Sequence, residues 1–248
     1  MKYSKTISSI FKSISELLIL LISMAGYVPK NATVVRTFAI VASMAFGLYL
    51  SHFQQNNFSL SVSYFFVCEL LYIGFISAVL SKNGLRHLFI RNLGGEKDGY
   101  LAFEAILGVL FFHNAMSIGY IASANPGNLF AFVNKGLLLV FVTVMFISGF
   151  IIKILAAKAV TIEIYYWKDM FLGRKISDFI VSGPYKYFSN PMYGIGQIQA
   201  YATAIWYGSG YGLMAALLNQ ILIFTFYFLI EKKFINRVYQ NNVPLQVK

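Results

Sequence analysis

Long uninterrupted apolar runs alternate with short polar turns over most of this chain, and several runs exceed 18 residues. In hydrocarbon only helices and closed barrels satisfy every backbone group internally, and continuous rather than alternating runs favour helices. The pattern therefore predicts an all-α, polytopic transmembrane bundle. About six spans are expected, at residues 32–51, 59–80, 100–124, 129–152, 192–207 and 212–230.

Residues 10–28 are ambiguous. Lys12 and Glu16 interrupt the segment, and its continuous apolar part, Leu17 to Val28, is short for a crossing. An amphipathic helix lying in the membrane interface suits this pattern better than a seventh span, and both alternatives remain open.

Charge placement predicts an orientation. The basic residues gather between the second and third spans, between the fourth and fifth, and after the sixth, whereas the turns at 52–58, 125–128 and 208–211 have none. By the positive-inside rule the basic regions are cytoplasmic, in a bacterial inner membrane or the endoplasmic reticulum. The net charge of +11 then indicates anionic lipid headgroups as partners rather than nucleic acid. No obligate protein partner is inferred.

Isolated polar residues inside the spans carry weaker signals. Cys68 is the single cysteine and lies within a span, so no disulfide forms within the chain. No metal site is expected, because His113 has no partner at ligand spacing. Glu69 is costly to bury with its charge, so it marks either a functional site or a protonated contact between helices.

A polar, ring-rich segment, SGPYKYFSNPMYGIG at 182–196, precedes a run without charge over 191–230. Glycines at 208–212 divide that run, which predicts a helical hairpin over 192–231 with two arms that each rise about 25–28 Å. Tyr193 and Glu231 are then expected at one membrane face. Aromatic rings and a carboxylate beside a stiff loop suit a small cationic or zwitterionic ligand with a flat ring.

These residues carry a resemblance to a known superfamily. Gly183-Pro184-Tyr185, then Asn190-Pro191-Met192-Tyr193, then the hairpin and Glu231 resemble the signature of the integral-membrane methyltransferases, which include phospholipid N-methyltransferases and isoprenylcysteine carboxyl methyltransferases. The Asn-Pro-Met-Tyr run and Phe171-Leu172-Gly173 are similar to the phospholipid branch. The resemblance covers about residues 150–240. It implies a site for S-adenosylmethionine in which Glu231 holds the methionine amino group, with these cofactor-binding residues: Gly183, Pro184, Tyr185, Tyr187, Asn190, Pro191, Tyr193 and Glu231.

The chain departs from that signature in several places. Ser189 and Asn190 replace an Arg-His pair, Ile195 replaces a glycine, and Lys232 replaces a second glutamate. A Gly-x-Gly motif is not evident at 151–159. Two regions are expected. Residues 1–99 form an N-terminal membrane region of unknown role. Residues 100–248 form a methyltransferase-like core that contains a cytoplasmic cofactor loop at 153–191 and the hairpin.

The resemblance implies methyl transfer from S-adenosylmethionine to a lipid that enters from the bilayer, preferably a phospholipid amine. Alternatives are a prenylcysteine carboxyl methyltransferase, an NADPH-dependent membrane reductase of related fold, and a non-catalytic lipid-binding protein. The catalytic residues are unknown, and polar candidates on the predicted cytoplasmic side are Glu104, Asn190, Asp178, Glu163 and Asp169. Glu104 is expected in the first turn of a helix, where the helix N-terminus stabilises a carboxylate, and this explains the residue as well as a catalytic role does. Asp169 and Asp178 are better explained as members of solvated ion pairs than as catalytic residues.

Overall fold

The computed structural model describes residues 2–54, 57–176 and 182–240, so the candidate Asp178 lies outside the described residues. Within them every regular element is a helix or a single helical turn, which confirms the predicted all-α class. The helices are α1 (Lys2–Met24), α2 (Val34–Gln54), α3 (Phe58–Leu80), α4 (Arg86–Asn92), α5 (Glu96–Ala124), α6 (Lys135–Tyr165), α7 (Lys168–Leu172), α8 (Ile198–Trp206), α9 (Gly210–Phe226) and α10 (Lys232–Ile235).

Five helical stretches among the described residues are long and apolar enough to cross a membrane. They are Val34–Phe53, Phe58–Leu80, Glu96–Ala124, Lys135–Leu172 and Gly210–Tyr239. Each corresponds to one of the predicted spans, and their outer faces carry many exposed large apolar side chains, as lipid contact requires. The length and composition of these helices therefore identify the chain as an integral membrane protein.

The prediction for 192–207 is wrong in helix length. In that range α8 covers only nine residues, Ile198–Trp206, which rise about 13 Å rather than 25–28 Å. The preceding residues form tight turns, in which the amide of Gly194 donates to the carbonyl of Asn190 (3.1 Å) and that of Gly196 to Pro191 (2.8 Å). A Cβ at position 196 would lie 2.8 Å from the Pro191 oxygen, so only glycine permits this compact turn.

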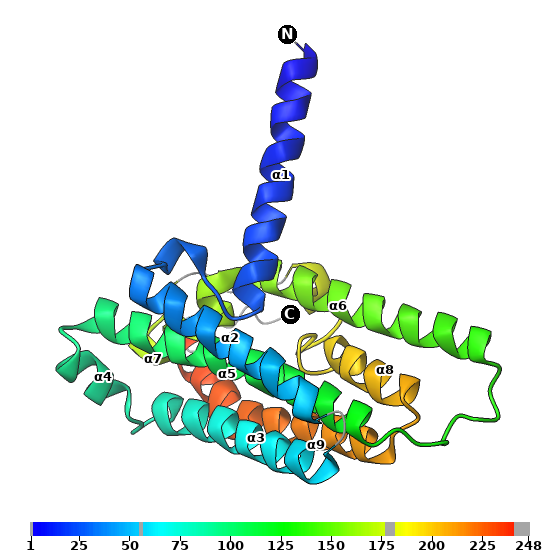
Figure 1. Ribbon diagram of the computed structural model, residues 1–248. Helices are drawn as coiled ribbons and strands as arrows, with labels where there is room; N and C mark the ends of the chain where they lie inside the picture. Colours follow the sequence, from blue (N-terminus) through cyan, green and yellow to red (C-terminus); the bar gives the residue numbers. More distant parts are fainter. Residues whose placement is uncertain (1, 55–56, 177–181, 241–248) are drawn as a thin grey trace, which may run out of the picture.

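Helix α5 is the centre of the bundle and packs against α2, α3 and α9, while α8 lies between α6 and α9. Figure 1 shows these helices running alongside one another. Helix α1 instead projects crosswise from the bundle (Figure 1) and is not one of the five spanning stretches. If the bundle crosses the membrane along its length, α1 runs roughly parallel to the membrane plane, which is the direction expected for an interfacial helix.

The end of α6 departs from regular helix geometry and redirects the chain. Thr161 has φ +72° and Trp167 has φ +51°, values that are uncommon for residues other than glycine. The prediction that the fourth span ends at residue 152 is wrong, because α6 continues to Tyr165. The short helix α7 follows, and it places Asp169 in its first turn.

A chain of buried and half-buried polar side chains joins four helices. Glu69 of α3 accepts hydrogen bonds from Asn114 of α5 (2.8 Å) and from Asn219 of α9 (2.7 Å). Asn219 accepts from Gln197 (2.5 Å), which in turn accepts from Lys153 of α6 (2.6 Å). The contact between helices expected for Glu69 is thus present. Lys153, which charge counting placed in a cytoplasmic loop, lies within this packed chain because α6 extends past it.

His113 has a packing role in this structure. Its ring nitrogens bond the hydroxyls of Ser43 (2.7 Å) and Tyr64 (2.5 Å). These contacts tie α5 to α2 and α3, because each of the three residues comes from a different helix.

Candidate functional site

A cavity of about 370 Å³ opens between the end of α6, α7, the segment 185–193 and the end of α9 with α10. Four of the residues predicted to bind a cofactor line it: Tyr185, Asn190, Tyr193 and Glu231. The cavity therefore brings together the two ends of the predicted signature, which are separated in sequence by the whole hairpin.

Tyr193 and Glu231 are in direct contact across 38 positions of sequence, with the tyrosine hydroxyl donating to the carboxylate at 3.0 Å. The predicted convergence is confirmed even though the first arm is short. Glu231 is the last residue of a π-helical turn, Tyr227–Glu231, that continues α9. The Trp167 side chain is a second hydrogen-bond partner of the same carboxylate. A carboxylate held by two neutral donors keeps oxygen lone pairs for a cationic ligand.

The loop that carries Tyr193 is fixed from two sides. The Asn190 side chain accepts from the backbone amide of Tyr193 at 3.1 Å, which makes a local turn. Gln220 of α9 donates to the carbonyls of Tyr193 (2.9 Å) and Gly194 (3.3 Å), and it accepts from the hydroxyl of Tyr201 (2.6 Å). Gln220 is not among the residues predicted for the site, although a glutamine within an uncharged apolar arm is a visible signal.

Aromatic rings form one wall of the cavity. The Tyr193 ring meets Phe224 and Tyr227 edge to face, with centroids 6.4 and 6.2 Å apart. Burial, with a smaller contribution from the Glu231 charge, raises the pKa of Tyr185, so its phenol stays protonated at neutral pH. Such a wall offers ring faces for a flat heteroaromatic group and hydroxyls for its polar edge.

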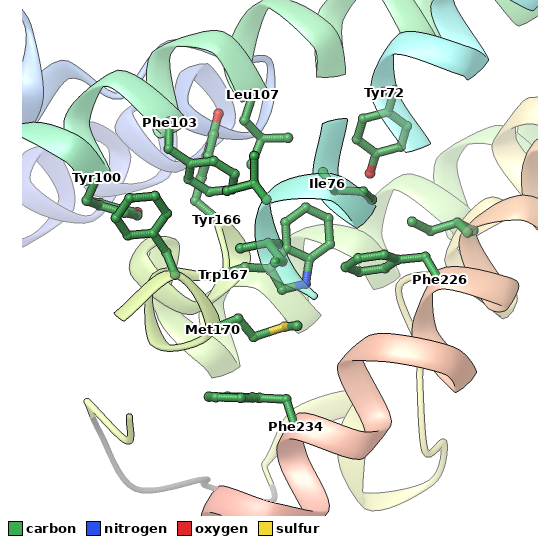
Figure 2. Packing of buried hydrophobic residues seen from close by; sticks show 14 of the residues in the cluster. Tyr72, Ile76, Tyr100, Phe103, Leu107, Tyr166, Trp167, Met170, Phe226 and Phe234 are labelled. Carbon is green, nitrogen blue, oxygen red and sulfur yellow. The ribbon is translucent and has the colours of Figure 1, made fainter. Parts of the chain in front are cut away.

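The inner side of the cavity is apolar and densely packed. Figure 2 shows the buried cluster behind it, where side chains from α3, α5, the junction of α6 and α7, and α9 point toward one another. Trp167 belongs to both the cavity lining and the buried cluster. It lines the cavity, and the centre of its ring lies 5.2 Å from that of Phe226. Interiors packed in this way move little, so the groups on the inner wall are held in place.

Two further charged side chains line the cavity. Asp169 is buried, and its carboxylate accepts from the backbone amide of Met170 (2.8 Å) and from the hydroxyl of Tyr239 (2.9 Å). The solvated ion pair expected for Asp169 is therefore wrong. Lys232 follows Glu231 directly, and its ammonium lies 5.4 Å from the centre of the Phe228 ring.

The other predicted cofactor residues lie outside the cavity lining. Pro184 and Pro191 are buried next to the loop, and Tyr187 is 82% exposed. Gly183 has φ +54° at the start of a 3-10 turn over Gly183–Lys186. These residues shape the loop that carries Tyr185 and Asn190 rather than facing the cavity.

Two of the acidic candidates have partners elsewhere. Glu104 is buried and pairs with Arg36 at 2.6 Å, and it also accepts from Asn31 and Tyr100. The expectation that it occupies the first turn of its helix is wrong, because α5 begins at Glu96. Glu163 pairs with the exposed Lys30 at 3.2 Å. Neither residue lines the cavity.

An apolar helical bundle with a loop and a hairpin around a cavity lined by charged residues defines the class of this chain, an integral membrane protein. Residues 137–242 match the sequence model of the phospholipid methyltransferase family. All cavity-lining residues, from Ala159 to Tyr239, fall within that match. The resemblance to the phospholipid branch is thereby confirmed for this part of the chain, and the family's name implies a methyl donor.

A curated relative agrees with this assignment. The chain is similar to the phosphatidylethanolamine N-methyltransferase of Eremothecium gossypii, with 28% identity over 106 residues. That alignment covers 43% of this chain and 13% of the relative's length. No solved structure matches the chain significantly.

Proposed function

We propose that this protein transfers methyl groups from S-adenosylmethionine to the amine of a membrane phospholipid. The observation that carries the proposal is the Tyr193–Glu231 pair at 3.0 Å, inside a cavity whose lining lies wholly within the phospholipid methyltransferase match. The match to that family favours this activity over carboxyl methylation, nicotinamide-dependent reduction or lipid binding without catalysis.

The residues present fit S-adenosylmethionine. The cavity of about 370 Å³ lies within the range of roughly 300–1,000 Å³ of small-molecule sites. Glu231 would hold the ammonium of the methionine part, and the rings of Tyr185 and Tyr193 would contact the adenine. When bound, S-adenosylmethionine supplies an electrophilic methyl group to a nitrogen lone pair.

Asp169 is the group best placed to prepare the substrate amine. At neutral pH the amine arrives as an ammonium ion, whose nitrogen has no free lone pair, so a base has to accept its proton. The Asp169 carboxylate lines the cavity and is oriented by Met170 and Tyr239. Beyond this proton transfer the cavity contributes by orienting the nitrogen and excluding water, which are large effects in displacement reactions.

The membrane arrangement follows the charge pattern of the sequence. The site would face the cytoplasm, beside basic segments that attract anionic headgroups. The phospholipid would enter from the bilayer, in a bacterial inner membrane or the endoplasmic reticulum, without an obligate protein partner.

The test is label transfer to phosphatidylethanolamine vesicles that contain the purified protein and S-adenosylmethionine with a labelled methyl group. Asp169→Asn should lower the rate about 10²-fold at neutral pH, as expected for loss of a general base. The deficit should shrink as the pH approaches the amine's own pKa, because the amine then arrives deprotonated. Asp98→Asn is the matched control, since Asp98 is exposed in the first turn of α5. Cofactor binding without label in any lipid would refute the proposed function.

A further inference from the structure

An open apolar groove runs along the outer face of α9 and meets the cavity. It shares two residues with the cavity, Phe224 and Phe228. The groove is lined by Leu217, Gln220, Ile221, Phe224, Thr225, Phe228 and Leu229. Because α9 belongs to a stretch able to span a membrane, the groove faces hydrocarbon and suits a hydrocarbon chain.

Lys232 stands where the groove and the cavity meet. It lines the cavity, and its ammonium lies 5.4 Å from the ring of Phe228, one of the two shared residues. The ion pairs among the described residues are Lys30–Glu163, Arg36–Glu104 and Arg174–Glu96, so Lys232 belongs to none of them. Lys232 is exposed, so its ammonium is accessible to an anion.

The other charged residues of the cavity lining are the carboxylates of Asp169 and Glu231. Without Lys232 the cavity would carry only negative charge, which repels a phosphate diester. The lysine places a positive charge at the point where a lipid headgroup would pass from the groove into the cavity.

We propose that Lys232 binds the phosphate of the lipid substrate, with the hydrocarbon chain in the α9 groove and the amine at Asp169. The inference rests on the proposed function and deepens it by naming the headgroup contact. The carboxylate of the cofactor is the other anion available to a lysine here. The position of Lys232 beside Phe228 and the groove favours the phosphate, and the two sources are separable by experiment.

The experiment compares Lys232→Gln, Lys232→Arg and the matched control Lys233→Gln, whose lysine is exposed outside the cavity lining. The probes are a short-chain phosphatidylethanolamine, an alkylamine of equal chain length without phosphate, and S-adenosylmethionine. Lipid binding is read from the fluorescence of Trp167, which lines the cavity, in a Trp206→Phe background. Calorimetry measures the cofactor.

We expect Lys232→Gln to weaken phosphatidylethanolamine binding about 10- to 100-fold, the usual effect of losing a hydrogen bond to a charged group. Binding of the alkylamine and of S-adenosylmethionine should stay unchanged, and Lys232→Arg should bind the lipid within a few-fold of the parent. Equal effects on lipid and alkylamine, or no effect on either, would overturn the inference. Weaker cofactor binding with intact lipid binding would assign Lys232 to the cofactor's carboxylate instead.

The outcomes also separate this inference from the proposed function. Lipid binding that depends on Lys232 without any methyl transfer would refute the function and support the phosphate contact. Methyl transfer with lipid binding indifferent to residue 232 would do the reverse. Should Lys232→Gln fold poorly, Lys232→Met provides a second neutral variant to which the same expectations apply.

Discussion

Glu231→Gln is the sharpest single test of the cofactor site. The substitution keeps the size of the side chain and its ability to accept the hydrogen bond that Tyr193 donates at 3.0 Å. It removes the negative charge that the proposed ammonium of S-adenosylmethionine requires. The change in affinity therefore reports the charge rather than the shape of the site.

The expected magnitude follows from the bonds involved. A hydrogen bond to a charged partner contributes about 1.5–3 kcal/mol, which corresponds to roughly a 10- to 150-fold rise in the dissociation constant. Tyr193→Phe should have an effect of similar direction, because the phenol orients the carboxylate. The two substitutions act through the same pair, so the double variant should lose less than the sum of the single losses.

Isothermal titration calorimetry of S-adenosylmethionine against the detergent-purified protein measures these constants directly. Glu163→Gln is the matched control, since Glu163 lies outside the cavity and pairs with Lys30, whose side chain is 77% exposed. It should leave the dissociation constant within about twofold, because surface pairs contribute only about 0–1 kcal/mol. A Glu231→Gln protein that binds the cofactor as tightly as the parent would refute the assignment of Glu231.

Two further substitutions test the framework around the site. Glu104→Gln should lower the free energy of unfolding by about 3–5 kcal/mol, because it leaves the buried charge of Arg36 without its partner. Thermal denaturation in detergent measures this, and an unchanged midpoint would contradict a structural role for Glu104. Gly196→Ala should disrupt the loop and abolish cofactor binding in calorimetry, because its Cβ would lie 2.8 Å from the Pro191 oxygen and 2.9 Å from Lys153. Its control is Gly74→Ala, where nothing lies within 4 Å and about 0.5–1 kcal/mol of stabilisation is expected, so normal binding by Gly196→Ala would contradict the packing argument.

Patterns that act over short range predicted much of this fold. Continuous apolar runs located each of the five long helices, although α6 extends well past the predicted end of its span at residue 152. Their location is predictable because an unsatisfied backbone group in hydrocarbon is costly. The uncharged hairpin correctly brought Tyr193 to Glu231. The same reasoning failed for residues 192–197, where Gly194 and Gly196 take part in tight turns that an apolar run does not reveal.

The sequence alone does not predict which side chains contact one another across helices. Lys153 is predicted to lie in a loop, because its charge alone does not reveal that its ammonium donates a hydrogen bond to Gln197 within the bundle. The place of Asp169 in the cavity depends on the backbone turn at Trp167 and on Tyr239, which is 70 positions away. Such pairings are set by tertiary packing rather than by any local period.

The π-helical turn Tyr227–Glu231 makes this site sensitive to register. A π-turn holds one more residue than the α-helical turn that it interrupts, and each residue of an α-helix rotates the side-chain direction by about 100°. If the same residues wound as a regular α-helix, Glu231 would therefore point about 100° away from its present direction and out of the cavity. In comparisons with relatives, a gap of one position within this turn is therefore compatible with an equivalent glutamate, whereas a relative of equal length with a regular α-helical turn would direct its carboxylate elsewhere.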